Sequence, residues 1–510
     1  MTNMPWHFEV TPQDEHNLRL VEHVHPREWT PPTPEPCYNL VVIGAGTAGL
    51  ISALGCAGLG GKVALVERHL MGGDCLNVGC VPSKSFIRSA RAAAETASGD
   101  RFGLTPRSPS ESDFAGVMER LRRLRANISR NDSAKRYSEL GVDMFFGEAV
   151  FTGHNTVTVG ETTLRFRKAV IAAGARAVRP GIEGLDKVGF MTNETVFNLT
   201  KLPRRLVVIG GGPIGCELAQ GFRRLGSQVT IVQHSRFLSR EDPEASALLA
   251  GVFKGEGIRV LPGARVVRVE ASPTGKRVTI ATFDGQQTVE ADEILIGAGR
   301  TPNVEGLGLT TAGVTYDKDK GVVVDDFLRT TNSDIFAAGD VCMDWKFTHA
   351  ADAGARIAVQ NALFLGRKRV SALNMPWCTY TDPEIAHVGL YEADAEARGI
   401  PTDTFKVEMA DMDRAIVDGE ETGFVKILVK KGTDRILGAT IVAAHAGDLI
   451  SEISVAMAAK VGLKTLGNVI HPYPTQAEAI KRVADAYNRT RLTPRVAGVL
   501  KWWLKRQRKG

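Results

Sequence analysis

The chain has 510 residues, enough for about three domains, and its 43% hydrophobic content with 53 glycines suits a layered α/β protein. It has no run of 18 or more apolar residues, so the sequence predicts no membrane-spanning helix. The formal net charge of +6 comes from the C-terminal end, because residues 481–510 carry ten Lys or Arg and one acid. The remainder is slightly acidic, which argues against a nucleic-acid groove on the body of the protein.

The first 36 residues lack the basic and then apolar pattern of an export signal, so we expect a cytoplasmic protein. Their prolines cluster at Pro26, Pro31, Pro32, Pro34 and Pro36. We therefore predict an extended N-terminal arm over residues 1–37. Five cysteines form no spaced cluster and are expected to be small buried residues, so no metal site is predicted. They are Cys37, Cys56, Cys216, Cys342 and Cys378.

A dinucleotide-binding pattern begins at residue 40. Residues 40–49 read as a buried strand that runs into a glycine-rich turn, and residues 50–59 suit a helix. The glycines of the turn are Gly44, Gly46 and Gly49. They respectively allow a tight turn, close approach of backbone to a pyrophosphate, and packing of the helix on the strand. A second strand over 62–67 ends in Glu67, whose carboxylate can accept hydrogen bonds from a ribose.

Two cysteines follow in the run 72–84. Cys75 and Cys80 are five residues apart, a spacing that fits neither a zinc knuckle nor a CxxC redox helix. In a regular helix their Cα atoms would lie roughly 8–9 Å apart, beyond the roughly 7 Å limit for a disulfide. The pair can bond only if the helix start is distorted, and Asn77 and Gly79 tolerate such backbone.

A second dinucleotide pattern occupies residues 206–217. Its glycines are Gly210, Gly212 and Gly215. The strand that follows, 228–232, leads into Gln233 rather than a carboxylate, and His234 and Arg236 come directly after it. Without the acid there is less repulsion of a 2′-phosphate, and the two basic side chains can contact one. The sequence therefore favours NADPH over NADH as the second nucleotide, with NADH as the alternative.

In combination, these motifs make the chain similar to the flavoprotein disulfide reductases, the group of dihydrolipoamide dehydrogenase, glutathione reductase and mercuric reductase. The resemblance covers residues 38–494 and includes three further runs. Residues 299–303 close the pyridine-nucleotide region in the manner of the family. Residues 334–340 resemble its second FAD motif, in which Asp340 would reach the flavin ribityl chain. Residues 380–386 resemble the opening of its dimerisation domain.

The resemblance implies an α/β fold with two Rossmann-like dinucleotide-binding domains and a C-terminal α+β dimerisation domain. FAD would be bound by residues 38–190 and 305–372, NAD(P)H by 191–304, and a homodimer formed through 373–494. The implied cofactor-binding residues are Gly44, Gly46, Gly49, Glu67, Gly73, Lys84, Gly174, Gly210, Gly212, Gly215, Glu217, Gln233, Arg236, Gly299, Arg300, Gly339 and Asp340.

The resemblance also implies a hydride relay. Electrons would pass from NADPH through FAD to a Cys75–Cys80 disulfide. Cys80 would then lie against the flavin as the charge-transfer thiolate, and Cys75 would attack the acceptor. Lys84 would lie near the reactive flavin nitrogen, with Glu217 as its partner. A helix N-terminus and the flavin environment would favour the thiolate, which is the reactive form.

The C-terminal segment departs from the enzymes that reduce disulfides, in which a histidine serves as the acid/base for the outer thiol. Here His471, Tyr473 and Glu478 align with that motif, and Tyr473 occupies the base position. With a reference pKa of about 10 against about 6.5 for histidine, tyrosine is a poor proton acceptor at neutral pH. It can still donate a hydrogen bond or approach a metal. His471 can replace the base in part or serve only in packing. In the family this segment completes the partner subunit's active site.

Tyrosine at this position resembles mercuric reductase, which reduces a thiol-bound soft cation, the kind of metal that suits thiolate ligands. The C-terminal cysteine pair of that enzyme is missing, however, since no cysteine follows Cys378. The leading hypothesis is a mercuric reductase-like NAD(P)H oxidoreductase acting on a thiol-bound metal ion or a thiol/disulfide acceptor. The alternatives are a dihydrolipoamide dehydrogenase and, from another class, a non-catalytic flavin-binding regulatory protein.

The tail, residues 495–510, extends past the family pattern. Its apolar residues fall on one stripe at helical spacing and its basic residues lie beside or opposite them. The stripe comprises Val496, Val499, Leu500, Trp503 and Leu504, with Trp502 beside it; the basic residues include Lys501, Lys505, Arg506 and Arg508. This composition is typical of a helix lying in an anionic membrane surface. A helix packed on the dimer and a frayed basic end are the alternatives.

Overall fold

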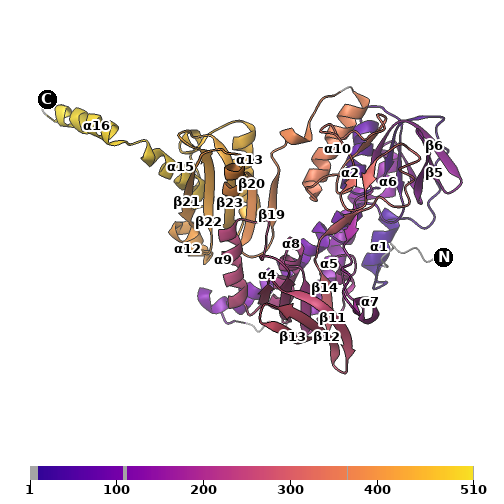
Figure 1. The fold of residues 1–510 in the computed structure, drawn as a ribbon, viewed down its shortest axis with the longest axis horizontal. Coiled ribbons are helices and arrows are strands. Elements are labelled where there is room, and N and C mark those ends of the chain that lie inside the picture. The colour runs from indigo at the N-terminus through magenta and orange to yellow at the C-terminus, as the bar shows by residue number, and fades with distance from the viewer. Residues whose placement is uncertain (1–9, 107–111, 365, 509–510) are drawn as a thin grey trace. The chain divides into compact units, whose positions relative to one another are not determined.

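A computed structural model describes residues 10–106, 112–364 and 366–508. The ends of the predicted N-terminal arm and tail, residues 1–9 and 509–510, lie outside the described residues. The chain divides into two compact units. The first comprises residues up to 100, 104–236 and 256–373, and the second comprises 101–103, 237–255 and 374–510 (Figure 1).

The first unit contains two nucleotide-type sheets and their helices. Its helices are α1 (Glu15–Val24), α2 (Thr47–Ala57), α3 (Gly73–Asn77), α4 (Cys80–Ala97), α5 (Phe114–Ser129), α6 (Ala134–Glu139), α7 (Leu185–Val188), α8 (Pro213–Arg224) and α10 (Thr348–Leu363). The strands of the larger sheet are β1 (Tyr38–Ile43), β2 (Val63–Glu67), β3 (Val142–Phe146), β4 (Ala149–Gly153), β5 (Thr156–Val159), β6 (Thr162–Ile171) and β18 (Ile335–Ala337).

The larger sheet has the order β3-β2-β1-β6-β5-β4, with β18 also paired to β6. The strands β3, β2, β1, β6 and β18 are parallel, and β5 and β4 continue the sheet as an antiparallel extension. Parallel strands need crossover connections, and α2 provides the first of them, between β1 and β2. Helix α2 also packs against α10, a segment about 300 residues later in the chain.

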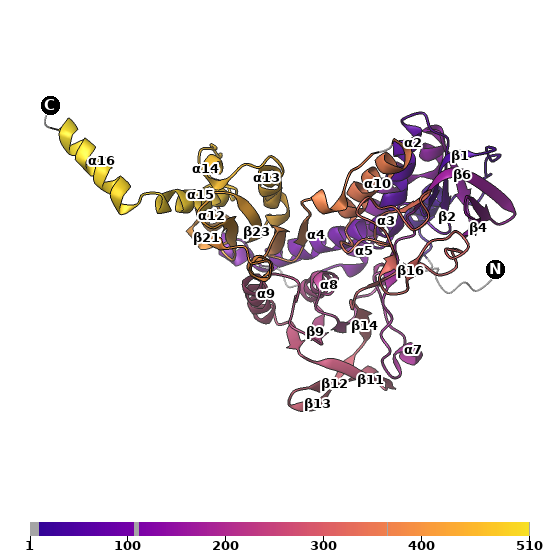
Figure 2. The ribbon, with the colours of Figure 1, turned by 45° about the horizontal axis from the view of Figure 1, so that its top comes forward.

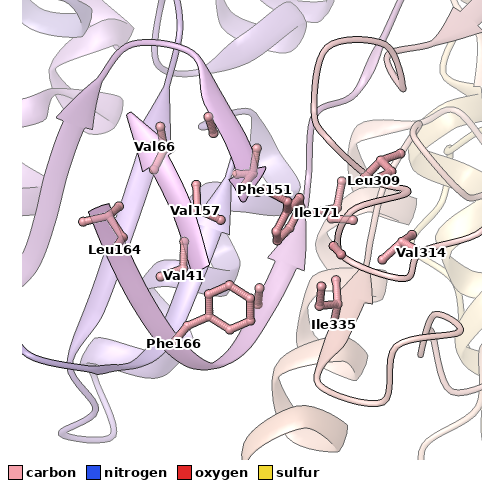
Figure 3. Close-up of a cluster of buried hydrophobic side chains, with 14 of the residues drawn as sticks. Val41, Val66, Phe151, Val157, Leu164, Phe166, Ile171, Leu309, Val314 and Ile335 are labelled. Atoms are coloured by element: carbon pink, nitrogen blue, oxygen red, sulfur yellow. The ribbon is translucent and has the colours of Figure 1, made fainter. Parts of the chain in front are cut away.

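A cluster of buried hydrophobic side chains joins the parallel strands, the antiparallel extension and a later part of the chain (Figure 3). Phe151, Val157 and Leu164 from β4, β5 and β6 meet Leu309 and Val314 from the later part of the chain. Residues between 304 and 342 therefore share a core with the larger sheet.

The second sheet of this unit is parallel, in the order β10-β9-β8-β14. Its strands are β8 (Arg205–Ile209), β9 (Gln228–Gln233), β10 (Arg259–Pro262) and β14 (Glu293–Ile296). An antiparallel sheet accompanies it, formed by β11 (Arg265–Ser272), β12 (Gly275–Thr282) and β13 (Gly285–Ala291). Two short pairs complete the unit: β7 (Ala175–Ala177) with β15 (Arg300–Pro302), and β16 (Tyr316–Asp317) with β17 (Gly321–Val322). Figure 2 separates the β11–β13 sheet from the larger sheet.

The second unit is an α+β body around one antiparallel sheet of order β19-β20-β23-β22-β21. The strands are β19 (Pro376–Thr379), β20 (Glu384–Gly389), β21 (Thr402–Glu408), β22 (Phe424–Lys430) and β23 (Ile436–Ala443). The helices are α9 (Pro243–Gly255), α11 (Glu392–Ala397), α12 (Asp413–Asp418), α13 (Ala446–Ala458), α14 (Leu463–Leu466), α15 (Glu478–Thr490) and α16 (Pro494–Gln507). Helix α13 packs on β20 and β23, and α15 on β21 and β22.

Helix α9 groups with the second unit although it lies within the predicted nucleotide region 191–304. Just before α9, the buried carboxylate of Glu241 accepts hydrogen bonds from the side chains of Trp377, Tyr391 and Thr379. These contacts explain the grouping, because they fasten the start of the α9 segment to the edge of the second unit's sheet.

The prediction of an extended N-terminal arm is wrong for residues 15–24, which form α1. Asp14 caps this helix, since its Oδ1 accepts a hydrogen bond from the Asn17 backbone N–H at 2.9 Å. Leu20 and Val24 are fully buried. The proline cluster misled the prediction because it begins only at Pro26, after the helix has ended.

Candidate active site

The first glycine-rich turn has the geometry that a dinucleotide requires. A Cβ on Gly44, whose φ is +100°, would lie 2.4 Å from the Ala172 carbonyl oxygen, and one on Gly49 would lie 1.7 Å from the Gly44 oxygen. The N-cap of helix α2 is Gly46, which provides no side-chain hydrogen bond to the first helical N–H groups. A Cβ on Gly46 would meet only Gly73 Cα, at 3.7 Å, so the protein itself does not require glycine there. Uncapped N–H groups beside an open backbone fit the pyrophosphate of FAD.

Glu67 holds this turn in place. Its carboxylate is buried at the end of β2, where Oε2 accepts a hydrogen bond from the Ala45 backbone N–H at 2.6 Å. Oε1 accepts one from the His69 backbone N–H at 2.8 Å. Burial raises the pKa of Glu67, and these two hydrogen bonds oppose that shift. Each oxygen has lone pairs left for a ribose hydroxyl.

The second turn repeats the first with an amide in place of the carboxylate. Gly210 has a φ of +111°, and the N-cap of α8 is Gly212, which provides no side-chain hydrogen bond. Gln233 Oε1 accepts a hydrogen bond from the Gly211 backbone N–H at 2.7 Å, as Glu67 does from Ala45. Its Nε2 donates to Ser235 Oγ at 2.7 Å, while Arg236 is exposed. The donor set fits a second dinucleotide, with an uncharged side chain where the first turn has an acid.

The helix that carries the two cysteines is interrupted between them. Helix α3 ends at Asn77 and α4 begins at Cys80, and Gly79 in the break has φ −128° and ψ −114°. A Cβ on Gly79 would lie 2.7 Å from the Asp74 carbonyl oxygen. Glycine therefore permits the fold-back that brings together two residues which a continuous helix would separate.

Cys75 and Cys80 are present as thiols and are hydrogen-bonded to each other. The bond from Cys75 lowers the pKa of Cys80 to about 6, with help from Thr348 and from the charge of Lys84, against the effect of burial. Cys80 Sγ and Thr348 Oγ1 are 3.2 Å apart. The pKa of Cys75 is raised, first by that same hydrogen bond and then by burial. One thiol of the pair is thus the stronger acid.

Lys84 and Glu217 form an ion pair, with Lys84 Nζ 2.8 Å from Glu217 Oε2. Lys84 lies one turn after Cys80 on α4, and Glu217 lies on the first turns of α8, where it is buried. Helices α4 and α8 pack against each other. The pair therefore joins the cysteine-bearing helix to the second nucleotide turn.

Arg300 connects helix α3, which carries Cys75, to residues 334–340, the run that resembles the second FAD motif. Its guanidinium pairs with Asp74 of α3 and lies 3.3 Å from Asp340 Oδ2, and it donates to the Ala175 carbonyl oxygen at 2.5 Å. Burial raises the pKa of Asp340, and the charge of Arg300 opposes that shift. The flanking glycines adopt left-handed φ: Gly174 (+66°), Gly299 (+115°) and Gly339 (+81°).

The C-terminal residues lie in the second unit and have different acidic partners. His471 Nε2 is 3.0 Å from Glu452 Oε1, and Tyr473 donates its hydroxyl hydrogen to Asp413 Oδ2 at 2.6 Å. That hydrogen bond raises the pKa of Tyr473. Glu478, at the start of α15, pairs with Arg482. The tyrosine is therefore a hydrogen-bond donor to an acid outside the motif.

Three contributors to the site were missed from the sequence: Thr348, Asp74 and the buried Arg125 of α5, which is described below. Asp74 stands directly before Cys75, so its position was a usable signal. Thr348 lies 268 residues after Cys80, and no local pattern marks it. In the described parts of the chain, no group of three or more His, Cys, Asp or Glu side chains gathers to hold a metal ion.

The two nucleotide turns and the fold define a flavin- and pyridine-nucleotide-binding oxidoreductase. Profiles of the pyridine nucleotide-disulphide oxidoreductase family and of its dimerisation domain match residues 38–355 and 375–484 respectively. The chain belongs to this family. It is an enzyme that uses FAD and NAD(P)H, and its dimerisation domain supports a homodimer.

Relatives and solved structures agree with this assignment. The mercuric reductase of Lysinibacillus sphaericus is 35% identical over 456 residues, covering 89% of this chain and 83% of its own. That of Streptomyces lividans is also 35% identical, covering 88% and 96%. The HOCl-induced flavoprotein disulfide reductase RclA from Escherichia coli superposes with a TM-score of 0.79 at 28% identity, covering 88% and 99%. LpdA from Mycobacterium tuberculosis gives 0.80 at 26%, with the same coverage.

The predicted α/β fold with a dimerisation domain is confirmed. Among the described residues, no helix is long and apolar enough to cross a bilayer.

Proposed function

We propose that the enzyme transfers electrons from NADPH through a Cys75–Cys80 dithiol to a thiol-bound soft metal ion, with small disulfides as a second class of acceptor. The observation that carries this proposal is the broken helix, which holds the two thiols in contact and makes one of them unusually acidic. The names of the relatives support the metal as acceptor.

FAD, when bound, supplies the two-electron relay between NADPH and the disulfide. The residues of the chain control protons and charge. Thr348 and Lys84 stabilise the Cys80 thiolate, and Glu217 orients the Lys84 ammonium group. Cys75, whose pKa is raised, retains its proton until an acceptor arrives and then attacks it as the nucleophile of the pair.

The metal reaction balances with two electrons. Two thiolates bind Hg(II), two protons leave, and the electron pair passes to the metal as the sulfur–sulfur bond forms. The products are Hg(0) and the Cys75–Cys80 disulfide, which NADPH then reduces again. Cu(II), which is bound in a solved RclA complex, takes one electron, so two ions would be consumed per dithiol.

We further propose that Tyr473 and Glu478 complete the partner's active site across the dimer. The bond of Tyr473 to Asp413 supports a donor rather than a base. At position 473 the site offers a hydroxyl to a metal complex and no imidazole to accept a thiol proton, which favours a metal over a disulfide.

Acceptor-dependent turnover tests the function. FAD-loaded protein with NADPH is given Hg(II) or Cu(II) as thiol complexes, small disulfides or quinones, and separately dihydrolipoamide with NAD⁺. Metal-stimulated NADPH oxidation that is absent from Cys75→Ala supports the proposal. Faster dihydrolipoamide oxidation would instead identify a dihydrolipoamide dehydrogenase. If no acceptor gives turnover, the catalytic proposal is wrong.

The preference for NADPH rests on Gln233 and on the exposed Arg236. Gln233→Glu should shift the ratio of kcat/KM values toward NADH, because the carboxylate accepts from a ribose and repels a 2′-phosphate. Arg236→Ala should weaken NADPH alone. Equal wild-type kcat/KM for the two nucleotides, unchanged in both variants, would contradict the assignment.

We propose that the tail, residues 495–510, makes reversible contact with an anionic membrane surface. The cytoplasmic location of the protein stays a prediction. Helix α16 has no buried residue, and Val499, Leu500, Trp503 and Leu504 are all exposed. Each basic residue near an anionic surface contributes about 1 kcal/mol. Because α16 has no buried residue, protein ending at Pro494 is a suitable control for co-sedimentation with anionic vesicles at low and high salt. Equal partitioning of the two proteins would leave α16 as a packing element or a free end.

A further inference from the structure

Helix α1 lies outside the family match, which begins at residue 38. It is nevertheless integrated into the first unit, where it packs against α5. Asn17 and Leu20 are buried, and Asp14 at its start pairs with Arg122 of α5. Because α1 buries polar as well as apolar side chains, we expect it to make specific contacts with the rest of the unit.

The central contact is Arg125 of α5, which is only 1% exposed. Its Nη2 donates to Asn17 Oδ1 of α1 at 2.7 Å. Its Nη1 donates to the backbone carbonyl oxygen of Asn77, also at 2.7 Å. Asn77 lies between the two cysteines, at the end of α3. One buried guanidinium therefore joins the added helix to the break in the redox segment.

A second set of contacts runs in parallel. The Met71 backbone N–H donates to the carbonyl oxygen of Val24, the last residue of α1, at 3.1 Å. The side chain of Asn77 donates to the Met71 carbonyl oxygen at 3.0 Å and to that of Gly73 at 2.9 Å. Asn193 donates to the Val78 carbonyl oxygen at 3.3 Å. Hydrogen bonds from several parts of the chain therefore hold the backbone between Met71 and Val78 in place.

We propose that α1 is a brace for the redox segment, and that Asn17 and Arg125 are positioning residues for the Cys75–Cys80 pair. A helix end leaves carbonyl groups without intrahelical partners. Here the carbonyl at the end of α3 is satisfied by a charged donor, and α1 holds that donor in its orientation. This inference rests on the proposed redox role of the dithiol.

The brace acts on the distance between the thiols. In the reduced protein no covalent bond joins Cys75 to Cys80, so their proximity depends on the backbone at Asn77. If the backbone between α3 and α4 becomes more mobile, the two thiols meet less often, so the effective concentration of one thiol near the other falls. The disulfide then becomes less stable relative to the dithiol, and the hydrogen bond that acidifies Cys80 weakens.

The test measures the dithiol–disulfide equilibrium of the full-length, FAD-loaded protein against a glutathione redox buffer. We expect Asn17→Ala to shift this equilibrium about tenfold toward the dithiol, the scale of one hydrogen bond to a charged group, which corresponds to about 30 mV for a two-electron couple. The long-wavelength band of the reduced protein should also titrate at higher pH. Asn17→Asp, which keeps an acceptor for Arg125, should restore most of both properties.

Two controls separate bracing from general damage. Arg19→Ala removes an exposed bond between the same helices, from Arg19 Nη2 to Asn127 Oδ1 at 2.7 Å, and should leave the equilibrium unchanged. Phe151→Leu loosens the hydrophobic cluster of Figure 3 and should lower the melting temperature alone. An unchanged equilibrium in Asn17→Ala, or an equal shift in Phe151→Leu, would overturn the brace. A wild-type protein without a reducible disulfide would instead overturn the proposed function.

Discussion

The redox segment, residues 72–84, and the C-terminal segment, residues 471–478, differ in where their partners originate. Within the redox segment the two thiols are hydrogen-bonded to each other, and Lys84, on the same helix as Cys80, helps to lower the pKa of Cys80. In the C-terminal segment, His471 and Tyr473 bond to Glu452 and Asp413, which no part of the motif marks. In the first segment the local backbone brings the two thiols together and distant residues such as Thr348 and Arg125 support them, whereas in the second segment the hydrogen-bond partners of both side chains come from elsewhere in the chain. Chemistry common to the family should depend on the first, and the choice of acceptor on the second.

Loss of a cysteine should have the largest effect. Cys75→Ala should bind FAD and retain a long-wavelength charge-transfer band from Cys80, yet lose acceptor turnover by ~10⁴-fold or more, the scale seen when a catalytic nucleophile is removed. Cys80→Ala should lose the band. Steady-state assays and absorbance spectra of the same samples check both outcomes. Wild-type turnover by Cys75→Ala would show that the outer nucleophile lies elsewhere.

Tyr473→His should change the acceptor class. An imidazole at this position can take the proton that disulfide exchange requires, and general-base catalysis typically contributes ~10²–10⁴-fold. We therefore expect the rate with dihydrolipoamide or small disulfides to rise by at least about tenfold. Tyr473→Phe, which removes only the bond to Asp413, is the matched control and should not gain this activity. A high wild-type rate abolished by His471→Ala would instead identify His471 as the base.

Removal of the Lys84 charge should have a smaller, pH-dependent effect. Cys80 is a thiolate above its lowered pKa of about 6, and Lys84 contributes to that lowering. In Lys84→Met the pKa should rise toward the reference value of about 8.5, so the charge-transfer band should appear only at higher pH. Lys135→Met, at an exposed position on α6, is the control and should titrate like wild type. Identical titrations of all three proteins would show that Lys84 does not lower the pKa of Cys80.

The sequence predicted the parts of this protein in which chemistry follows from neighbours along the chain. Strand, glycines and helix forecast both nucleotide turns, and the five-residue spacing forecast a break between Cys75 and Cys80. Long-range partners were not predictable. Arg125 lies in a run rich in arginine, and no local pattern distinguishes it as the side chain that is buried at the redox segment. Arg300 contacts Asp74 across 226 residues of sequence. Helix α1 was missed because the proline cluster that suggested an extended arm begins only after the helix has ended.

The central claim is that the Cys75–Cys80 pair stores a second pair of electrons beside the flavin. Anaerobic titration of the FAD-loaded protein with NADPH or dithionite, followed by absorbance, tests it most directly. Wild type should take up four electrons per FAD, with the long-wavelength band appearing after the first two. Cys75→Ala and Cys80→Ala should each take up two. Uptake of only two electrons by wild type, without the intermediate band, would contradict the account.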